Sequence, residues 1–98
     1  MATIFQKIFL LPKEVGLIDI INSSKIQHMI EYDDAHMTTK TQYSINGNKA
    51  CILATHNWHH AQGDNYSLNV NNLITPDELF AKKIFMRMQK AYRKQKEH

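Results

Sequence analysis

The most regular pattern of hydrophobic and polar positions lies near the C-terminus, over residues 79–98. Apolar side chains recur there every three or four residues, the spacing that places them on one face of an α-helix, and cations fill most of the opposite face. We therefore predict an amphipathic helix that packs its apolar face on the rest of the chain. This predicted face comprises Phe80, Ala81, Ile84, Phe85, Met88, Ala91 and Tyr92.

A helix start signal precedes this pattern. Thr75 is predicted as the N-cap, with its hydroxyl accepting a hydrogen bond from the amide of Glu78 in a capping box. Pro76 would then occupy the first helical position, where its missing N–H costs nothing. We also expect Ile74 and Leu79 to contact each other as a hydrophobic staple across the helix start.

The middle of the chain has the composition and alternation of β-strands. Asn46 and Gly47 tolerate the positive φ that both central residues of a type I′ turn require, so they predict a hairpin between strands at 39–45 and 49–55. Residues 66–70 alternate apolar and polar side chains, which predicts a strand with one buried and one hydrated face.

The N-terminal third leaves more than one interpretation open. Residues 3–11 fit either a strand or a helix, and Pro12 ends the segment in both cases. Residues 15–21 are dense in branched side chains and favour a strand. Residues 25–32 fit a strand or a short helix capped by Ser24, and we favour the strand.

These patterns together predict an α+β fold. It consists of a small, mostly antiparallel β-sheet or partly open barrel of about five to six strands, with the C-terminal amphipathic α-helix packed on it. Ninety-eight residues suffice for one modest core, so we expect a single domain over residues 1–98. Residues 93–98 lack apolar anchors and are predicted to form a frayed basic tail.

Compartment and membrane association follow from composition. The chain has no apolar run long enough to span a bilayer, so no membrane partner is expected. The single cysteine, Cys51, excludes an internal disulfide and fits a reducing compartment. We therefore expect a cytoplasmic location, in a bacterial cell or a host cell.

Residues 15–56 also carry short motifs in a recognisable order. The run LIDIINSSKI at 17–26 is followed by IEYDD at 30–34 and by a segment at 39–47 that ends in Asn-Gly. In this order they resemble the small bacterial β-domains of the flagellar FlbD type, and more loosely the LytTR DNA-binding domains. The FlbD resemblance implies a β-domain without catalytic residues, whereas the LytTR resemblance implies DNA binding.

Charge is distributed unevenly along the chain. Residues 79–98 contain seven cations against one acid, a net charge of +6, while residues 1–78 contain five lysines against eight acids, a net charge of −3. Charge concentrated in one element creates a local field that attracts anions, which a scattered excess would not. The side chains predicted to bind a nucleic acid or an acidic protein surface are Lys82, Lys83, Met86, Arg87, Lys90, Arg93 and Lys94.

These observations favour a non-catalytic binding or regulatory module that contacts nucleic acid. The first alternative is a protein-interaction module of the kind made by phages and mobile elements, which would include a homo-oligomer formed when the basic helix of one copy meets the acidic body of another. Cations that are merely solvated remain the plainest interpretation. A helix lying on a membrane surface is disfavoured, because the core needs the apolar face.

A histidine-rich segment suggests a different chemistry. Residues 55–64 hold three of the six histidines, the only tryptophan and a carboxylate, which are candidate ligands for zinc or another divalent metal. In a continuous strand the first and last of these histidines would lie about 13 Å apart, whereas a short helix would bring all three to one face, and a solvated loop is the third possibility. The second alternative is therefore a small metal- or histidine-dependent enzyme at His56, His59, His60 and Asp64.

Overall fold

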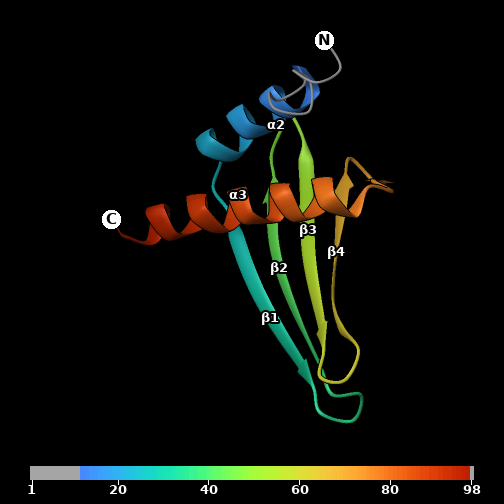
Figure 1. Cartoon of the computed structure of the whole chain (residues 1–98). Coiled ribbons are helices and arrows are strands. Elements are labelled where there is room, and N and C mark those ends of the chain that lie inside the picture. The colour runs from blue at the N-terminus through green and yellow to red at the C-terminus, as the bar shows by residue number, and fades with distance from the viewer. Residues whose placement is uncertain (1–11, 98) are drawn as a thin grey trace.

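The computed structural model describes residues 12–97, which form an α+β fold (Figure 1). Its strands form one open antiparallel sheet in the order β1-β2-β3-β4-β5, so each strand neighbours the next one in sequence. The predicted fold class is therefore confirmed. In chain order the elements are α2 (Pro12–Ser23), β1 (Gln27–Asp33), β2 (Thr38–Asn46), β3 (Cys51–His59), β4 (Gly63–Val70), β5 (Leu73–Ile74) and α3 (Glu78–Lys96).

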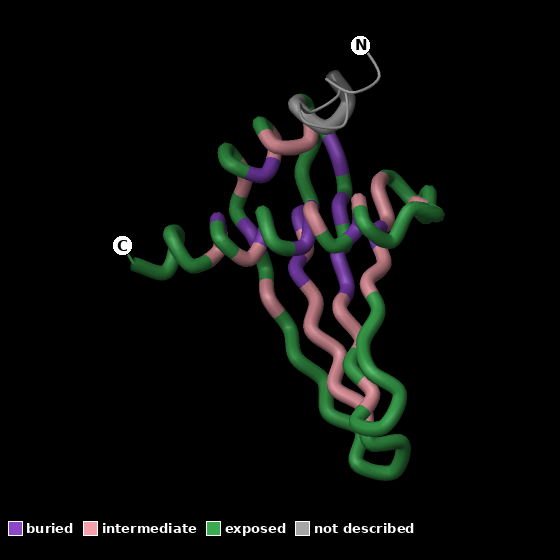
Figure 2. The backbone as a smooth tube through the Cα atoms, in the orientation of Figure 1, coloured by how far each residue is buried: buried purple, intermediate pink, exposed green. Residues whose placement is uncertain are grey.

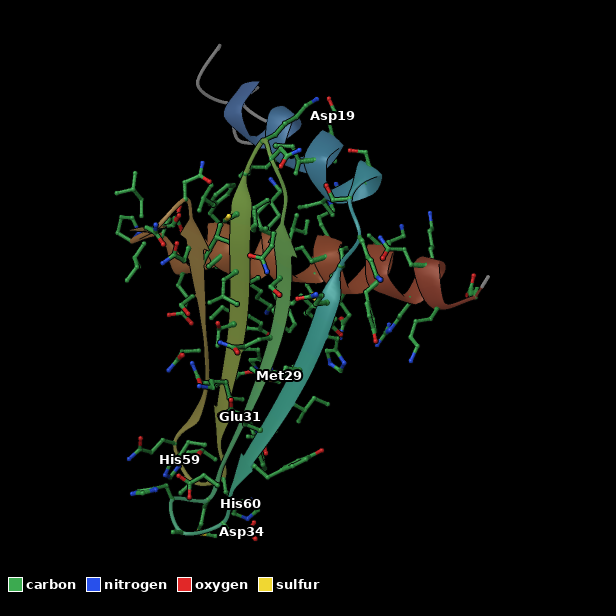
Figure 3. All side chains as sticks on the ribbon, turned by 180° about the vertical axis from the view of Figure 1, so that it is seen from behind. Asp19, Met29, Glu31, Asp34, His59 and His60 are labelled. Atoms are coloured by element: carbon green, nitrogen blue, oxygen red, sulfur yellow. The ribbon has the colours of Figure 1, made fainter. Side chains whose placement is uncertain are left out.

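Both helices lie on the same side of the molecule. α3 crosses the front of the sheet, and α2 lies at the sheet end that carries the β2–β3 turn (Figure 1). Seen from behind, the strands have no helix over them (Figure 3). An antiparallel sheet tolerates this arrangement when the side chains of its open face are polar. Here the strands carry mainly asparagine, glutamine, serine and threonine on that face.

The core lies between α3, α2 and one half of the sheet. Buried positions cluster where the helices cover the strands, while the far ends of the strands are exposed (Figure 2). On the covered face the register aligns Tyr43, Ala54 and Leu68 on three adjacent strands, all of them buried. The buried apolar core comprises Ile21, Ile26, Tyr43, Ile45, Ala50, Ile52, Ala54, Leu68, Ala81, Ile84, Phe85, Met88 and Ala91.

The apolar face of α3 matches the sequence prediction in full. Five of its seven predicted side chains are buried, and the other two, Phe80 and Tyr92, pack partly buried against the core. The helix also remains regular through residues 93–96, which were expected to fray. Gln95 contributes to this order by accepting a hydrogen bond from the Ile26 amide (3.1 Å) and donating to the Ser24 carbonyl (2.8 Å).

The predicted start of this helix is wrong by two residues. The N-cap is Asp77, whose carboxylate accepts hydrogen bonds from the amides of Leu79 (3.0 Å) and Phe80 (3.2 Å). Thr75 is still bound to the sheet, because its N–H donates to the Leu68 carbonyl at 2.8 Å. Pro76 therefore precedes the cap and does not occupy the first helical position.

The predicted hydrophobic staple is also wrong. The side chains of Ile74 and Leu79 are 73% and 81% exposed, so neither is covered by the other. The shift of the cap explains this result, since the staple joins the residue before the N-cap to the fourth helical residue. With Asp77 as the cap, Ile74 and Leu79 no longer occupy those two positions.

The β2–β3 hairpin forms, but its turn differs from the prediction. The pairing of Asn46 with Cys51 leaves a four-residue loop, closed by a 3.1 Å hydrogen bond from the Gly47 amide to the Ala50 carbonyl. The type I′ geometry occurs instead between β4 and β5, where Asn71 and Asn72 have φ values of 54° and 70°. Asparagine is one of the few side chains that adopt this region readily.

Residues 15–21 were predicted as a strand and belong to helix α2. Leu17, Ile20 and Ile21 pack on the core, a three- and four-residue spacing that only a helix places on one side. Pro12 is compatible with the first turn of this helix, since its missing N–H has no intrahelical partner there. The prediction of a strand at 25–32 is confirmed by β1, and residues 3–11 lie outside the described part of the chain.

Replacement of the N-cap tests the corrected helix start. Asp77→Ala should lower the free energy of unfolding by about 1 kcal/mol, because the Leu79 and Phe80 amides lose their acceptor. Asp77→Asn should preserve most of the stability, and Thr75→Ala should cost less than Asp77→Ala. Urea denaturation followed by circular dichroism measures all three values. A larger loss for Thr75→Ala would restore the cap that the sequence predicted.

Candidate functional site

The packing of α3 determines which of its side chains face solvent. Its apolar face lies on the sheet, so the opposite side of the helix points outward. We call this outward side the basic face. Lys83 is half-buried and the other six members are exposed, including the thioether of Met86 at 43%. The basic face comprises Lys82, Lys83, Met86, Arg87, Lys90, Arg93 and Lys94.

Cations extend across the full width of the basic face. On the side towards β4, the Lys82 ammonium lies 5.6 Å from the centroid of the Tyr66 ring, a cation–π arrangement. On the side towards α2, Arg87, Lys90 and Lys94 line a shallow hollow next to Asn22. At 1.5 Å per residue, the face extends about 16 Å along the helix axis from Lys83 to Lys94. It can therefore contact several phosphate groups at once.

The acidic side chains of the sheet leave this face largely uncompensated. The carboxylates of the sheet and its turns pair with other partners: Glu31 with Lys40, Asp33 with His36 and Asp64 with His56. None of these pairs involves Arg87, Lys90, Arg93 or Lys94. The field of the basic face is thus directed to solvent, where it can attract an anionic partner.

A second polar cluster lies where β3 and β4 emerge from under α3. The Nε2 atom of His56 is 3.0 Å from the Oδ2 atom of Asp64. The same imidazole stacks on the ring of Tyr66, with centroids 4.4 Å apart and an interplanar angle of 15°. Phe85 of α3 meets both rings in an edge-to-face arrangement, with its ring centroid 5.7 Å from that of His56 and 5.4 Å from that of Tyr66. Register explains the group, because His56 pairs directly with Tyr66.

The ionisation of Tyr66 is perturbed in this cluster. Burial of the phenol raises its pKa, since the charged form is less well hydrated there, and the carboxylate of Asp64 raises the pKa further. The hydroxyl is therefore protonated at neutral pH and is a weak acid. A protonated Tyr66 is not a base, so its role in this cluster is structural: its ring stacks on the His56 imidazole.

The four residues predicted as metal ligands do not converge. His56 and Asp64 are in contact, but His59 lies three residues along the strand and therefore points to the opposite face of the sheet. Its Nδ1 atom accepts hydrogen bonds from the Ala61 and Gln62 amides, both at 3.0 Å. His60 lies beyond the end of β3, 5.3 Å from the Trp58 ring.

The continuous-strand interpretation thus describes the histidine segment, since β3 extends to His59. Among the described residues, no three histidine, cysteine, aspartate or glutamate side chains are placed to hold one metal ion. The aromatic contribution of Tyr66 and Phe85 to this cluster was missed at the sequence level. Only the strand register, which places Tyr66 opposite His56, could have indicated it.

Comparison of the chain with protein-family models, with curated proteins and with solved structures found no match. The resemblance to FlbD and LytTR domains therefore stays a prediction. Within residues 12–97, neither helix is both long enough and apolar enough to cross a membrane.

The Tyr66 cluster makes a prediction about pH. Because the pKa of Tyr66 is higher in the folded protein than in free tyrosine, the protonated phenol should contribute to the free energy of unfolding below about pH 10. This contribution should be lost as the pH rises through the pKa of Tyr66 in the folded protein. The Asp64→Asn variant should lower the pKa of Tyr66. Spectrophotometric titration of tyrosinate absorbance measures this pKa. The ionisation step that is missing from the Tyr66→Phe variant is the one that belongs to Tyr66.

A distant carboxylate provides the control for that titration. Asp34 lies at the β1–β2 turn, so Asp34→Asn should leave the pKa of Tyr66 unchanged. Equal effects of the two aspartate variants would show that general charge, and not the contact in the cluster, determines the ionisation of Tyr66.

Proposed function

We propose that this protein is a non-catalytic binding module that contacts the phosphate backbone of nucleic acid through the basic face of α3. The observation that carries the proposal is the separation of an apolar and a cationic side on this helix. Every predicted apolar position packs on the core, and the cations opposite to them are exposed except for the half-buried Lys83. Phosphate contacts of this kind supply most of the affinity of sequence-independent binding.

The composition of the basic face indicates how such binding would work. It contains lysine and arginine but no aromatic ring, so it offers charge without a platform for stacking bases. Side chains that reach only phosphates position a protein without reading sequence. We therefore infer binding with little sequence preference, in which the net charge of −3 on residues 1–78 keeps the contact confined to α3.

An acidic protein surface is the second candidate partner. Two apolar side chains lie exposed among the cations, Leu79 at 81% and Met86 at 43%. Apolar groups of this size gain little from phosphates but contribute strongly in protein interfaces, where methionine is enriched. This observation favours a protein partner, whereas the extended row of cations favours nucleic acid.

The salt dependence of binding tests the first candidate. If three or four phosphates of a short labelled DNA duplex are contacted, the logarithm of the association constant should fall with the logarithm of the salt concentration at a slope of about −3 to −4. Lys90→Gln combined with Lys94→Gln should make this slope shallower by about 2, because each lost contact removes about 0.9. Fluorescence anisotropy provides the measurement.

A matched control replaces two cations outside the helix, Lys25→Gln with Lys49→Gln, and should leave the slope unchanged. Met86→Gln distinguishes the two candidates, since it should weaken a protein complex and leave duplex affinity unaltered. Absence of binding at low salt, or an affinity that does not depend on salt, would rule out the nucleic-acid proposal.

A further inference from the structure

Strand β1 is an open edge of the sheet. Within residues 12–97 it pairs with β2 on one side and with no strand on the other. Its side chains are mostly exposed, and three of them are apolar or aromatic: Met29 (48%), Ile30 (42%) and Tyr32 (73%). A seven-residue edge without proline or lysine is a template on which another strand can pair.

The direction of its free backbone groups follows from one contact. The Ile26 amide points away from β2, because it donates to the side chain of Gln95 at the overhanging end of α3. In an antiparallel ladder the backbone groups of alternate residues point to the same side. His28, Ile30 and Tyr32 therefore present their N–H and C=O groups along the open edge.

The opposite edge of the sheet is protected. There the amide of Tyr66 donates to the Glu78 carboxylate at 3.2 Å, and the carbonyl of Leu68 accepts from the Thr75 amide at 2.8 Å. Glu78 of α3 and Thr75 thus occupy the outward amide of Tyr66 and the outward carbonyl of Leu68. Gln95 covers only the residues before β1, which leaves the strand itself available.

We propose that a second copy of this chain pairs with this edge, β1 against β1 and antiparallel, about a two-fold axis at Ile30. In this register the numbers of two paired residues sum to 60. Ile30 therefore pairs with Ile30 of the second copy, and His28 pairs with Tyr32 of the second copy. All three outward-facing residues of each strand then take part, in about six backbone hydrogen bonds. A shift by two residues in one direction would require the Ile26 amide, which Gln95 already occupies.

The side chains of the two copies suit this register. On the helix side, Ile30 meets Ile30, and Tyr32 of the second copy lies beside His28. That imidazole already stacks on Tyr43 at 4.7 Å and lies 5.1 Å from Tyr92, so the added phenol extends an existing row of rings. On the other side, Met29 opposes Glu31. No two like charges face each other directly, which cross-strand pairing requires.

Charge complementarity supplies an independent reason for the same partner. α3 continues past β1, and its last turn carries Arg93, Lys94 and Lys96 (Figure 1). The proposed register places Asp34 of the second copy, which follows the end of its β1, next to this overhang. The two-fold axis creates this contact twice.

Mass measurement tests the proposal on the full chain. Light scattering at about 100 µM should give twice the 11.4 kDa of one chain if the dissociation constant is micromolar. Ile30→Lys should give a single chain, because it places two ammonium groups together on the axis. The control Leu53→Lys replaces a similarly exposed side chain (37%) in the central strand β3 and should remain dimeric.

Amide hydrogen exchange locates the interface and does not depend on any variant. The amides of His28, Ile30 and Tyr32 should be protected at high protein concentration and exchange faster on dilution. Unchanged exchange of these three amides, or a wild-type chain that remains monomeric at about 1 mM, would overturn the proposal. Loss of the dimer in Leu53→Lys as well as in Ile30→Lys would overturn it too.

Charge reversal tests the register itself. Asp34→Lys and Lys96→Asp should each weaken the dimer by about three- to tenfold, since each removes two symmetric surface ion pairs. The double variant exchanges the signs and should recover most of the affinity. A double variant as weak as the single ones would exclude the contact between the helix overhang and Asp34.

Discussion

The structure depends on the contact between the apolar face of α3 and the sheet. Phe85 is its centre, with its ring in edge-to-face arrangements with Tyr43, His56 and Tyr66 on three adjacent strands. An antiparallel sheet of this size cannot bury an apolar face on its own, so it requires a covering element. α3 provides that cover for half of the strand length, and the hydrophobic effect makes its attachment the dominant stabilising term.

Other features follow from this single packing interaction. Because one side of α3 must face the sheet, the cations on its other side are directed to solvent without any further device. Because α3 is longer than the width of the sheet that it crosses, its last turn extends past β1. There Gln95 binds the backbone of Ser24 and Ile26. Because it covers only half of the sheet, Ile30 and Tyr32 stay exposed. Core packing thus determines both candidate interaction surfaces.

The same physics explains what the sequence could and could not predict. The α3 face was predictable because periodicity at 3.6 residues is a local property of the chain. The cap at Asp77 was not, since the β4–β5 hairpin holds Thr75 through a bond to the Leu68 carbonyl, which the helix-capping pattern does not reveal. α2 was missed because branched side chains favour strands intrinsically, while its burial against the core favours a helix. His56 and Asp64 meet only through strand register.

The two proposed surfaces are compatible with each other. A two-fold axis normal to the sheet keeps the α3 helices of both copies on the same side, running in opposite directions. Each helix crosses its own sheet at His28, which lies opposite Tyr32 of the other copy, four residues further along the strand. At about 3.4 Å per residue the two helices are therefore displaced by about 14 Å along the strands. Pairing at β1 would accordingly leave the part of both basic faces from Lys82 to Lys90 exposed, so that one particle presents two phosphate-binding surfaces, which strengthens binding through effective concentration without any new residue.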